Sequence, residues 1–381
     1  MRTLAWGLFL GLFLSIPVAA GVGAWTPEGG IEPVFSRLLA DPGDPETLYA
    51  LVYMQDPDSS HALWKSTDGG ESWRSIQNGI PPVHLLAVDP LQAGRLYAWD
   101  SSNYSLPKLW ASEDGGETWA LRYDAEVRAT VSQLWQILAS PVRPGVLYGL
   151  SETVAGEPPF GFAIYRSADG GATWTRRGAV GTSRASIESL LHHPARNRLE
   201  YFDNDGFYTS DDNGLTWMVR GTFRGQGFQF VTRSHAAPDR LYGIPAMGAP
   251  CLVRSDDGGA RWTRTRRPEF PGSLSCTSLA VAPDDPGLLW VKAEGQLGSR
   301  YVHMISTSRD GGATWSRPRS FPSSFPIAVA GDPATLFAAG GDGYTAEGPF
   351  KSTDGGQTWT PSWDGIVTGD LRQALVALPS S

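Results

Sequence analysis

The chain has 381 residues, including 45 glycines, 29 prolines and 15 tryptophans. Hydrophobic residues make up 41% of the sequence, so it can bury a large core and is not of the disordered class. Charged residues make up only 18%, and the excess of turn-forming and aromatic residues favours an all-β protein. The net charge of −8 argues against nucleic-acid binding, which needs a basic surface.

The first residues have the pattern of a targeting signal. Arg2 precedes a short apolar run, and small residues follow as far as Ala24. This order predicts a signal peptide over residues 1–24, with export to the periplasm or the extracellular space. The alternative is an uncleaved N-terminal membrane anchor, because the apolar stretch is long enough to span a bilayer. We expect residues 25–381 to form a single domain.

An eight-residue phrase, Ser-x-Asp-Gly-Gly-x-Thr-Trp with small variations, recurs seven times. Its opening serines are separated by 43 to 55 residues, the period of propeller blades that have four strands each. Seven copies therefore predict an all-β fold, a seven-bladed β-propeller with four-stranded antiparallel blades. The repeated residues are Asp68, Asp114, Asp169, Asp212, Asp257, Asp310 and Asp354, with Trp73, Trp119, Trp174, Trp217, Trp262, Trp315 and Trp359.

A second phrase keeps the same period and places the strands within each unit. An inner apolar strand ends at a proline, as at Pro42, and a Leu-Tyr strand follows, as at Leu48. The third strand enters the Ser-x-Asp-Gly-Gly turn, and the fourth begins at its tryptophan. Residues 374–379 repeat the inner-strand phrase an eighth time. This copy is a candidate to pair with the first blade and help to close the ring, since an unpaired edge strand invites aggregation.

The chemistry of the repeated turn explains its residues. The glycines supply positive φ angles, and the aspartate and serine side chains accept backbone N–H groups within the turn. The tryptophan buries a large face between neighbouring sheets. Because seven copies cannot share one active site, we interpret the repeated aspartates as structural residues.

The chain has two cysteines, Cys251 in the fifth repeat unit and Cys276 in the sixth. In an exported protein they can form one disulfide. Two buried free thiols are the alternative, because cysteine packs well as a small hydrophobic residue. The sequence has no metal-binding or nucleotide-binding motif, and we expect no cofactor and no metal.

The repeated phrase resembles the BNR repeat or Asp-box, Ser-x-Asp-x-Gly-x-Thr-Trp, over about residues 35 to 362. Families that carry it include sialidases, xyloglucanase-type glycosidases, sortilin-like receptor domains and photosystem II assembly factors of the Ycf48/Hcf136-like type, and all are β-propellers. The regular boxes are most similar to the assembly-factor and xyloglucanase types. The resemblance implies that the box turns share one face and that ligands bind on the opposite face, formed by blade-to-blade crossovers and loops between second and third strands.

Arginine is concentrated in the crossovers, which hold 14 arginines and no lysine. One set lies one to three residues after a box tryptophan, and we expect it to protect the outer edge of the blades. The other set lies in the crossovers proper and forms either an anion-binding surface on the loop face or a solvated rim. The first set is Arg74, Arg122, Arg176, Arg177, Arg220, Arg264 and Arg317; the candidate binding set is Arg128, Arg184, Arg224, Arg266, Arg267, Arg319 and Arg372.

Two functions remain open from the sequence. We favour an exported protein-binding or assembly scaffold, whose partner is a protein or an anionic glycan on the loop face and which meets a membrane only through an uncleaved N-terminal segment. The alternative is a sialidase-like or xyloglucanase-like glycoside hydrolase that acts on an extracellular polysaccharide through paired carboxylates. Sialidases carry an Arg-Ile-Pro signature before the first box, and this chain lacks it. The loop carboxylates, which have no pairing identifiable by spacing, are Asp100, Asp124, Glu126, Glu152, Glu157, Asp342, Glu347, Asp364 and Asp370.

Overall fold

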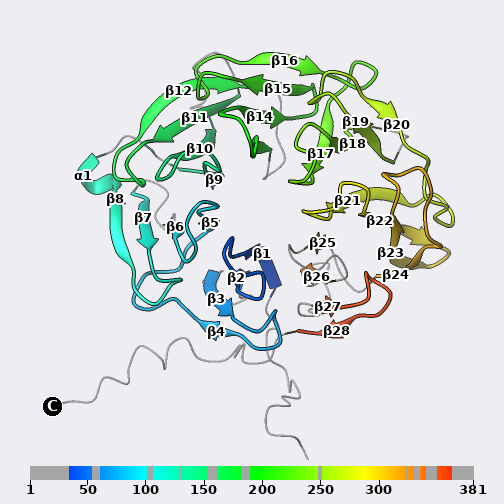
Figure 1. Ribbon diagram of the computed structural model, residues 1–381, viewed down its shortest axis with the longest axis horizontal. Helices are drawn as coiled ribbons and strands as arrows, with labels where there is room; N and C mark the ends of the chain where they lie inside the picture. The colour runs from blue at the N-terminus through cyan, green and yellow to red at the C-terminus, as the bar shows by residue number, and fades with distance from the viewer. Residues whose placement is uncertain are drawn as a thin grey trace, which may run out of the picture. The chain divides into compact units, whose positions relative to one another are not determined.

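Seven four-stranded antiparallel sheets stand as blades around a central channel (Figure 1). The computed structural model describes residues 34–53, 61–100, 106–128, 131, 133–152, 161–181, 189–247, 251–321, 325–328, 335–339 and 350–362, all within the unit Ile31–Ser381. The prediction of an all-β seven-bladed propeller is confirmed. The predicted signal peptide over residues 1–24 lies outside the described residues.

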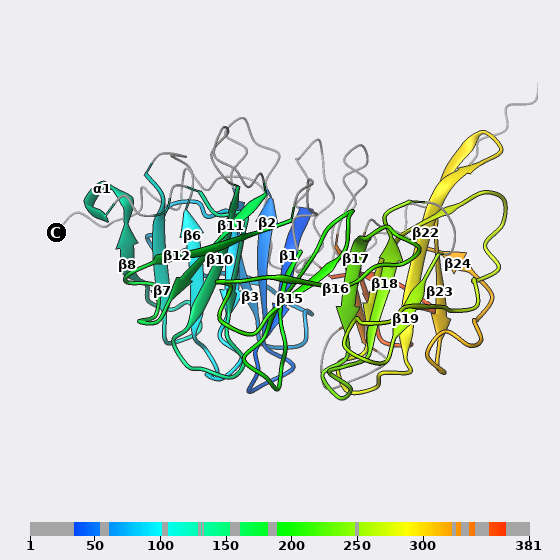
Figure 2. The same cartoon turned by 90° about the horizontal axis from the view of Figure 1, so that it is seen from above.

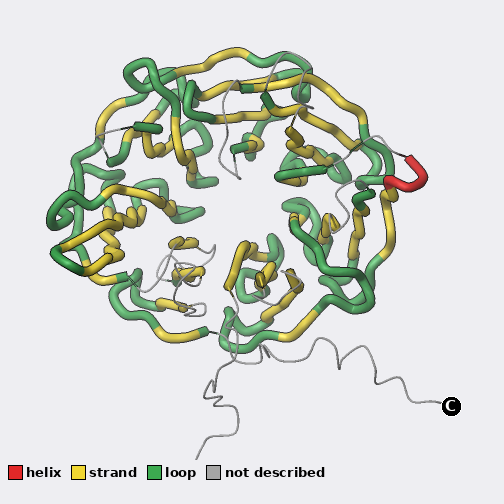
Figure 3. The backbone as a smooth tube through the Cα atoms, turned by 180° about the vertical axis from the view of Figure 1, so that it is seen from behind, coloured by secondary structure: helices red, strands yellow, loops and turns green. Residues whose placement is uncertain are grey.

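Each blade uses four strands that are consecutive in the chain, and Figure 3 shows the same ring from behind. Blades 1 to 3 are β1 (Val34–Ala40), β2 (Leu48–Tyr53), β3 (His61–Ser66) and β4 (Arg74–Ser75); β5 (Leu85–Val88), β6 (Leu96–Asp100), β7 (Lys108–Ser112) and β8 (Ala120–Asp124); and β9 (Gln136–Ala139), β10 (Leu147–Glu152), β11 (Phe162–Ser167) and β12 (Thr175–Val180). The short helix α1 (Ala125–Arg128) follows β8 at the outer rim.

Blades 4 to 7 repeat the same arrangement. They are β13 (Leu190–His192), β14 (Leu199–Phe202), β15 (Phe207–Ser210) and β16 (Met218–Gly221); β17 (Phe228–Arg233), β18 (Leu241–Pro245), β19 (Val253–Ser255) and β20 (Thr263–Arg264); β21 (Ser275–Val281), β22 (Leu289–Leu297), β23 (Arg300–Ser308) and β24 (Arg319–Ser320); and β25 (Phe325–Ala328), β26 (Leu336–Ala339), β27 (Phe350–Ser352) and β28 (Thr360–Pro361).

Burial falls from the second strand to the fourth strand of a blade. Every residue of β6 and of β18 is buried, because both faces of a second strand pack against neighbouring blades. The fourth strands β20, β24 and β28 are exposed throughout. This gradient explains why the Leu-Tyr strands are apolar on both faces, whereas the outer strands hold arginine and threonine.

The glycines of the box turns are needed for two physical reasons. Gly70 has a φ of 85°, a left-handed conformation that residues with a Cβ rarely adopt. A Cβ on Gly70 would also lie 2.6 Å from the ring of Phe337 in blade 7. The turn of one blade therefore packs directly against the next blade around the ring.

The ring closes between blades 1 and 7 through side chains. Phe337 of β26 packs in the core cluster of blade 1. The indole Nε1 of Trp73 donates to the carbonyl of Ser362 at 3.1 Å, and the Ser362 hydroxyl donates to the carbonyl of Gly70. Lys351 pairs with Glu71 at 2.6 Å. The eighth copy of the inner-strand phrase, residues 374–379, lies outside the described residues.

A disulfide joins Cys251, which shortly precedes β19 of blade 5, to Cys276 on β21 of blade 6. The two Cα atoms are 5.3 Å apart. It ties the crossover between these two blades to the propeller body. Within the described ranges, no helix has the length and apolar character needed to cross a bilayer.

Candidate functional site

The propeller has two different faces. On one face, which we call the turn face, box turns pack on the turn between the first two strands of their own blade. The N–H of Gly115 donates to the carbonyl of Gly94, and that of Gly170 to the carbonyl of Gly145. The opposite loop face carries the ends of the second strands and the crossovers, including α1 and the long β22–β23 hairpin, which Figure 2 shows rising on the same side.

The box aspartates are used inside their own turns. In blade 6 the hydroxyl of Thr314 donates to Asp310 Oδ2 at 2.5 Å and the hydroxyl of Ser308 to Asp310 Oδ1 at 2.8 Å. These bonds, led by the one from Thr314, lower the pKa of Asp310 to about 2. Equivalent serine bonds hold the other six aspartates. The carboxylates of the box aspartates therefore accept hydrogen bonds that stabilise the turns.

Several arginines that follow a box tryptophan bind the box of the next blade. Arg74 pairs with Glu117, Arg122 donates to the carbonyls of Asp169 and Gly170, and related bonds run from Arg177 to Asp212 and from Arg220 to Asp257. These side chains connect neighbouring blades.

Of the seven candidate binding arginines, four have side chains that the structure describes. Arg266, Arg267 and Arg224 are exposed in crossovers, and Arg319 is exposed on β24. Arg224 lies over its neighbour Phe223, far along the chain from the other three. Arg128 ends α1, with its side chain outside the described residues, as are Arg184 and Arg372.

The expectation that the crossover arginines lie on the loop face, away from the boxes, is wrong for two of them. The N–H of Arg266 donates to Gly312 of the blade 6 box at 3.0 Å, and Arg319 lines a pocket together with Asp354 of the blade 7 box. Arg266 follows β20 closely and Arg319 lies on β24, and each of these fourth strands has only two residues, so both arginines remain near the box of the next blade. The prediction that positive charge in the crossovers lies away from the boxes therefore does not hold for these two residues.

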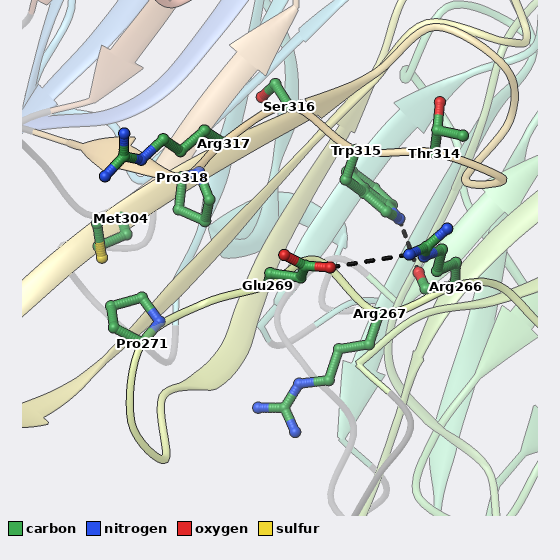
Figure 4. Close-up of a pocket in the computed structure, with 10 residues that line it drawn as sticks. All are labelled: Arg266, Arg267, Glu269, Pro271, Met304, Thr314, Trp315, Ser316, Arg317 and Pro318. Carbon is green, nitrogen blue, oxygen red and sulfur yellow. Dashed lines mark hydrogen bonds and ion pairs between the residues drawn. The ribbon is translucent and has the colours of Figure 1, made fainter.

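Arg266 and Arg267 instead line a cavity of about 680 Å³ on the outer wall between blades 5 and 6 (Figure 4). Arg317 and Trp315 of blade 6 form its other side. Glu269 points toward Arg266, with which it forms an ion pair at 3.8 Å. This cavity unites two of the candidate binding arginines with one from the outer-strand set.

On the loop face, a row of charged side chains crosses the end of blade 2. The strand register places Asp100 of β6 opposite Lys108 of β7, and Lys108 opposite Asp124 of β8, so the three side chains share one face of the sheet. Lys108 Nζ lies 3.3 Å from Asp124 and 3.6 Å from Glu126. The bond to Asp124 raises the pKa of Lys108. We call Asp100, Lys108, Asp124 and Glu126 the blade 2 row.

The blade 2 row stands on a rigid base. Trp99, Leu109 and Tyr123 immediately adjoin its members in sequence, and all three are buried in one core cluster. The rings of Trp99 and Tyr123 are stacked with centroids 5.9 Å apart. Because side chains alternate along a strand, the core residues fix the direction of the charged ones. The other predicted loop carboxylates, Glu152 included, have side chains outside the described residues.

A second polar cluster on this face was missed from the sequence. On blade 6, Lys292 is buried and lies 2.6 Å from Glu294, whose same oxygen is 3.1 Å from Nδ1 of His303. Burial lowers the pKa of Lys292. The signal available in the sequence was a lysine and a glutamate at alternate positions of a mostly apolar strand, Leu289–Leu297.

The central channel offers fewer reactive groups. Its cavity of about 920 Å³ is lined by the inner strands of five blades and by their proline turns. Among the described lining residues the carboxylate is Asp41, which accepts bonds from the hydroxyl of Tyr49 and the N–H of Gly94. Burial lowers the pKa of the lining residue His192 to about 4. Within the described part of the chain, no cluster of ligands that could hold a metal ion is present.

Comparison with known proteins adds to this geometry. The BNR/Asp-box repeat model matches residues 350–361. A xyloglucanase of Paenibacillus sp. is 27% identical over 321 residues, covering 78% of this chain and 27% of the relative. A probable oligoxyloglucan-reducing end-specific xyloglucanase of Neosartorya fischeri is 24% identical, covering 88% of the chain and 43% of the relative. The chain thus spans less than half the length of these relatives.

Solved structures share the fold at low sequence identity. The GH74 xyloglucanase of Xanthomonas campestris superposes with a TM-score of 0.61 at 17% identity, covering 88% of this chain and 55% of that one. A structure of YCF48 bound to D1 peptide superposes with a TM-score of 0.53 at 16% identity, covering 86% and 90%.

These findings contradict the prediction of a protein-binding or assembly scaffold. The curated relatives reported above are named as xyloglucanases, which favours the glycoside hydrolase alternative. The predicted resemblance itself is confirmed by the matching repeat model, by the strand order and by the superpositions. The chain is a seven-bladed β-propeller built from BNR/Asp-box repeats.

Proposed function

We propose that this protein is a glycoside hydrolase that acts on an extracellular polysaccharide of the xyloglucan type. The observation that carries the proposal is the similarity to the Paenibacillus xyloglucanase, which extends along 78% of this chain. The substrate class is taken from the name of that relative. The predicted signal peptide fits the proposal, because such a polysaccharide is met outside the cell.

We assign the chemistry to the blade 2 row. Hydrolysis of a glycosidic bond uses two carboxyl groups, one to protonate the leaving oxygen and one to activate water or attack the sugar. Asp100 and Asp124 lie on strands separated by one intervening strand, so their Cα atoms are roughly 10 Å apart. Side chains that share one face can close that distance to the roughly 5–10 Å used by retaining and inverting enzymes.

Lys108 has a positioning role in this assignment. Its ammonium group lies between the two aspartates in the strand register and within 3.3 Å of Asp124. The ion pair holds the Asp124 side chain in place, and a base or nucleophile must be positioned in this way. Trp135, 40% exposed where the first strand of blade 3 begins, adds an aromatic surface on the loop face against which a sugar ring can stack.

The test is hydrolysis of xyloglucan by the purified chain, measured as release of reducing ends, with variants Asp100→Asn and Asp124→Asn. Each substitution keeps the side-chain shape and removes one ionisable carboxyl, so we expect kcat to fall about 100-fold or more. Glu113→Gln is the matched control, because Glu113 is an exposed carboxylate on the turn face, paired with Arg95. It should leave kcat unchanged.

Two outcomes would overturn the proposal. The first is an intact, folded chain that releases no reducing ends from xyloglucan or from other β-glucans. The second is hydrolysis that both asparagine variants retain at the rate of the unchanged chain, which would remove the blade 2 row from the chemistry. Thermal unfolding of each variant separates a lost catalytic group from a lost fold.

A further inference from the structure

The cavity between blades 5 and 6 has the size of a ligand site. Its volume of about 680 Å³ is within the range of small-molecule pockets. One wall is the crossover from blade 5, with Arg266, Arg267 and Glu269, and the other is the segment Trp315–Pro318 of blade 6. It lies on the outer wall beside the box of blade 6, away from the blade 2 row.

Charge in this cavity is opposite to that of the whole protein. Three guanidinium groups, those of Arg266, Arg267 and Arg317, line it together with one carboxylate, that of Glu269, whereas the chain carries a net charge of −8. Guanidinium groups bind carboxylates in a planar, two-bond geometry. The lining therefore has an excess of positive charge, contributed by two blades, and this charge favours an anionic ligand.

Glu269 marks the place that the anion of a ligand would take. It points into the space between the arginines and pairs with Arg266 at 3.8 Å, while its side chain is 86% exposed. An ion pair that long and that exposed contributes little stability. A carboxylate from a ligand can therefore displace Glu269 at small cost.

Trp315 and its neighbours indicate a sugar rather than a simple ion. The indole of Trp315 is fixed because its Nε1 donates to the carbonyl of Arg266 at 2.7 Å. Trp315, Met304 and Pro318 give the cavity apolar surface next to the arginines. A fixed aromatic ring beside guanidinium groups suits a pyranose ring that carries a carboxylate.

The cavity wall is held in place before any ligand binds. The crossover is anchored by the bond from Arg266 N–H to Gly312, by the bond from Arg267 to the carbonyl of Leu274 at 3.1 Å, and by the disulfide at Cys276. A site that is already formed loses less entropy on binding.

We propose that this cavity binds a uronic acid residue of a polysaccharide, as an accessory site on the outer wall. The inference goes beyond the proposed hydrolase, because binding here needs no bond cleavage. The two proposals can be tested separately, because this one is tested by the affinity of the outer-wall cavity and the other by hydrolysis at the blade 2 row.

The experiment is calorimetric titration of the full chain with oligogalacturonate, and with a neutral cello-oligosaccharide of the same length. We expect the acidic oligosaccharide to bind at least 10-fold more tightly. Arg266→Gln combined with Arg317→Gln should weaken its binding at least 10-fold. Glu269→Gln should strengthen binding two- to fivefold, because the competing internal carboxylate is removed. Arg300→Gln, an exposed arginine on the hairpin of blade 6, is the matched control and should change nothing.

Three results would overturn the proposal. They are equal affinity for the acidic and the neutral oligosaccharide, unchanged affinity in the double arginine variant, and equally tight binding of polyglutamate, which would indicate charge attraction without sugar recognition. The substituted side chains are exposed, and the Trp315 bond uses the backbone carbonyl of Arg266, so these variants are expected to fold. Circular dichroism checks this for each variant.

Discussion

At the scale of single residues, the box turn shows how one missing hydroxyl changes a repeated structure. In blade 3 the hydroxyl of Thr173 donates to Asp169 Oδ2 at 2.6 Å. In blade 5 the same position holds Arg261, which gives Asp257 only its backbone N–H. The fifth box therefore has one hydrogen bond fewer to its aspartate.

We predict that Arg261→Thr stabilises the protein. The new hydroxyl should donate to Asp257, and for an exposed bond we expect the free energy of unfolding to rise by about 0.5–1 kcal/mol. Denaturant unfolding measures this change. The reciprocal variant Thr173→Arg removes the equivalent bond in blade 3 and should lower stability by a similar amount. A loss of stability in Arg261→Thr would show that the arginine has a role of its own.

At the scale of elements, the strands of each blade could be predicted because the sequence repeats them. A fixed box position sets the third and fourth strands, and the apolar phrase ending at proline sets the first. The blade 2 row could not be predicted in the same way. Asp100, Lys108 and Asp124 are brought together by the register of three strands, and spacing along the chain does not specify which residues face one another across a sheet.

The path of the crossovers also could not be predicted from the sequence. Arg266 and Arg319 lie beside box residues rather than on the loop face, because the fourth strands β20 and β24 have two residues each. The sequence of a crossover gives its charge, but it does not show which face of the propeller the crossover lies on. The blade 6 cluster of Lys292, Glu294 and His303 shows the same limit, since its members come from two strands.

Contacts between blades lead to a prediction about the outer-strand arginines. Arg122 of blade 2 donates to two carbonyls in the box of blade 3. Arg122→Gln should lower the free energy of unfolding by about 1 kcal/mol, because two partly exposed carbonyls lose a charged donor. Arg264→Gln is the control, since no hydrogen bond from its side chain to the next box is seen in the described part of the chain. It should change stability by less than about 0.5 kcal/mol.

At the scale of the whole molecule, the contacts that close the ring between blades 1 and 7 contribute to the stability of the propeller. Each described blade supplies its own four strands, so blades 1 and 7 are joined by packing and side-chain bonds. The Ser362 carbonyl accepts from Trp73, and its hydroxyl donates to Gly70. Both bonds are buried, where an unpaired group is costly.

Truncation tests this mode of closure. A chain that ends after Asp364 keeps the Ser362 peptide carbonyl and both bonds and should unfold within about 1 °C of the full chain, whereas a chain that ends after Thr360 loses them and should unfold several degrees lower. Calorimetry measures both midpoints. Removal of residues 365–381 also removes the eighth inner-strand phrase, 374–379. A large fall already at the first truncation would therefore mean that this segment helps to close the ring, and that the side-chain bonds to Ser362 are not sufficient by themselves.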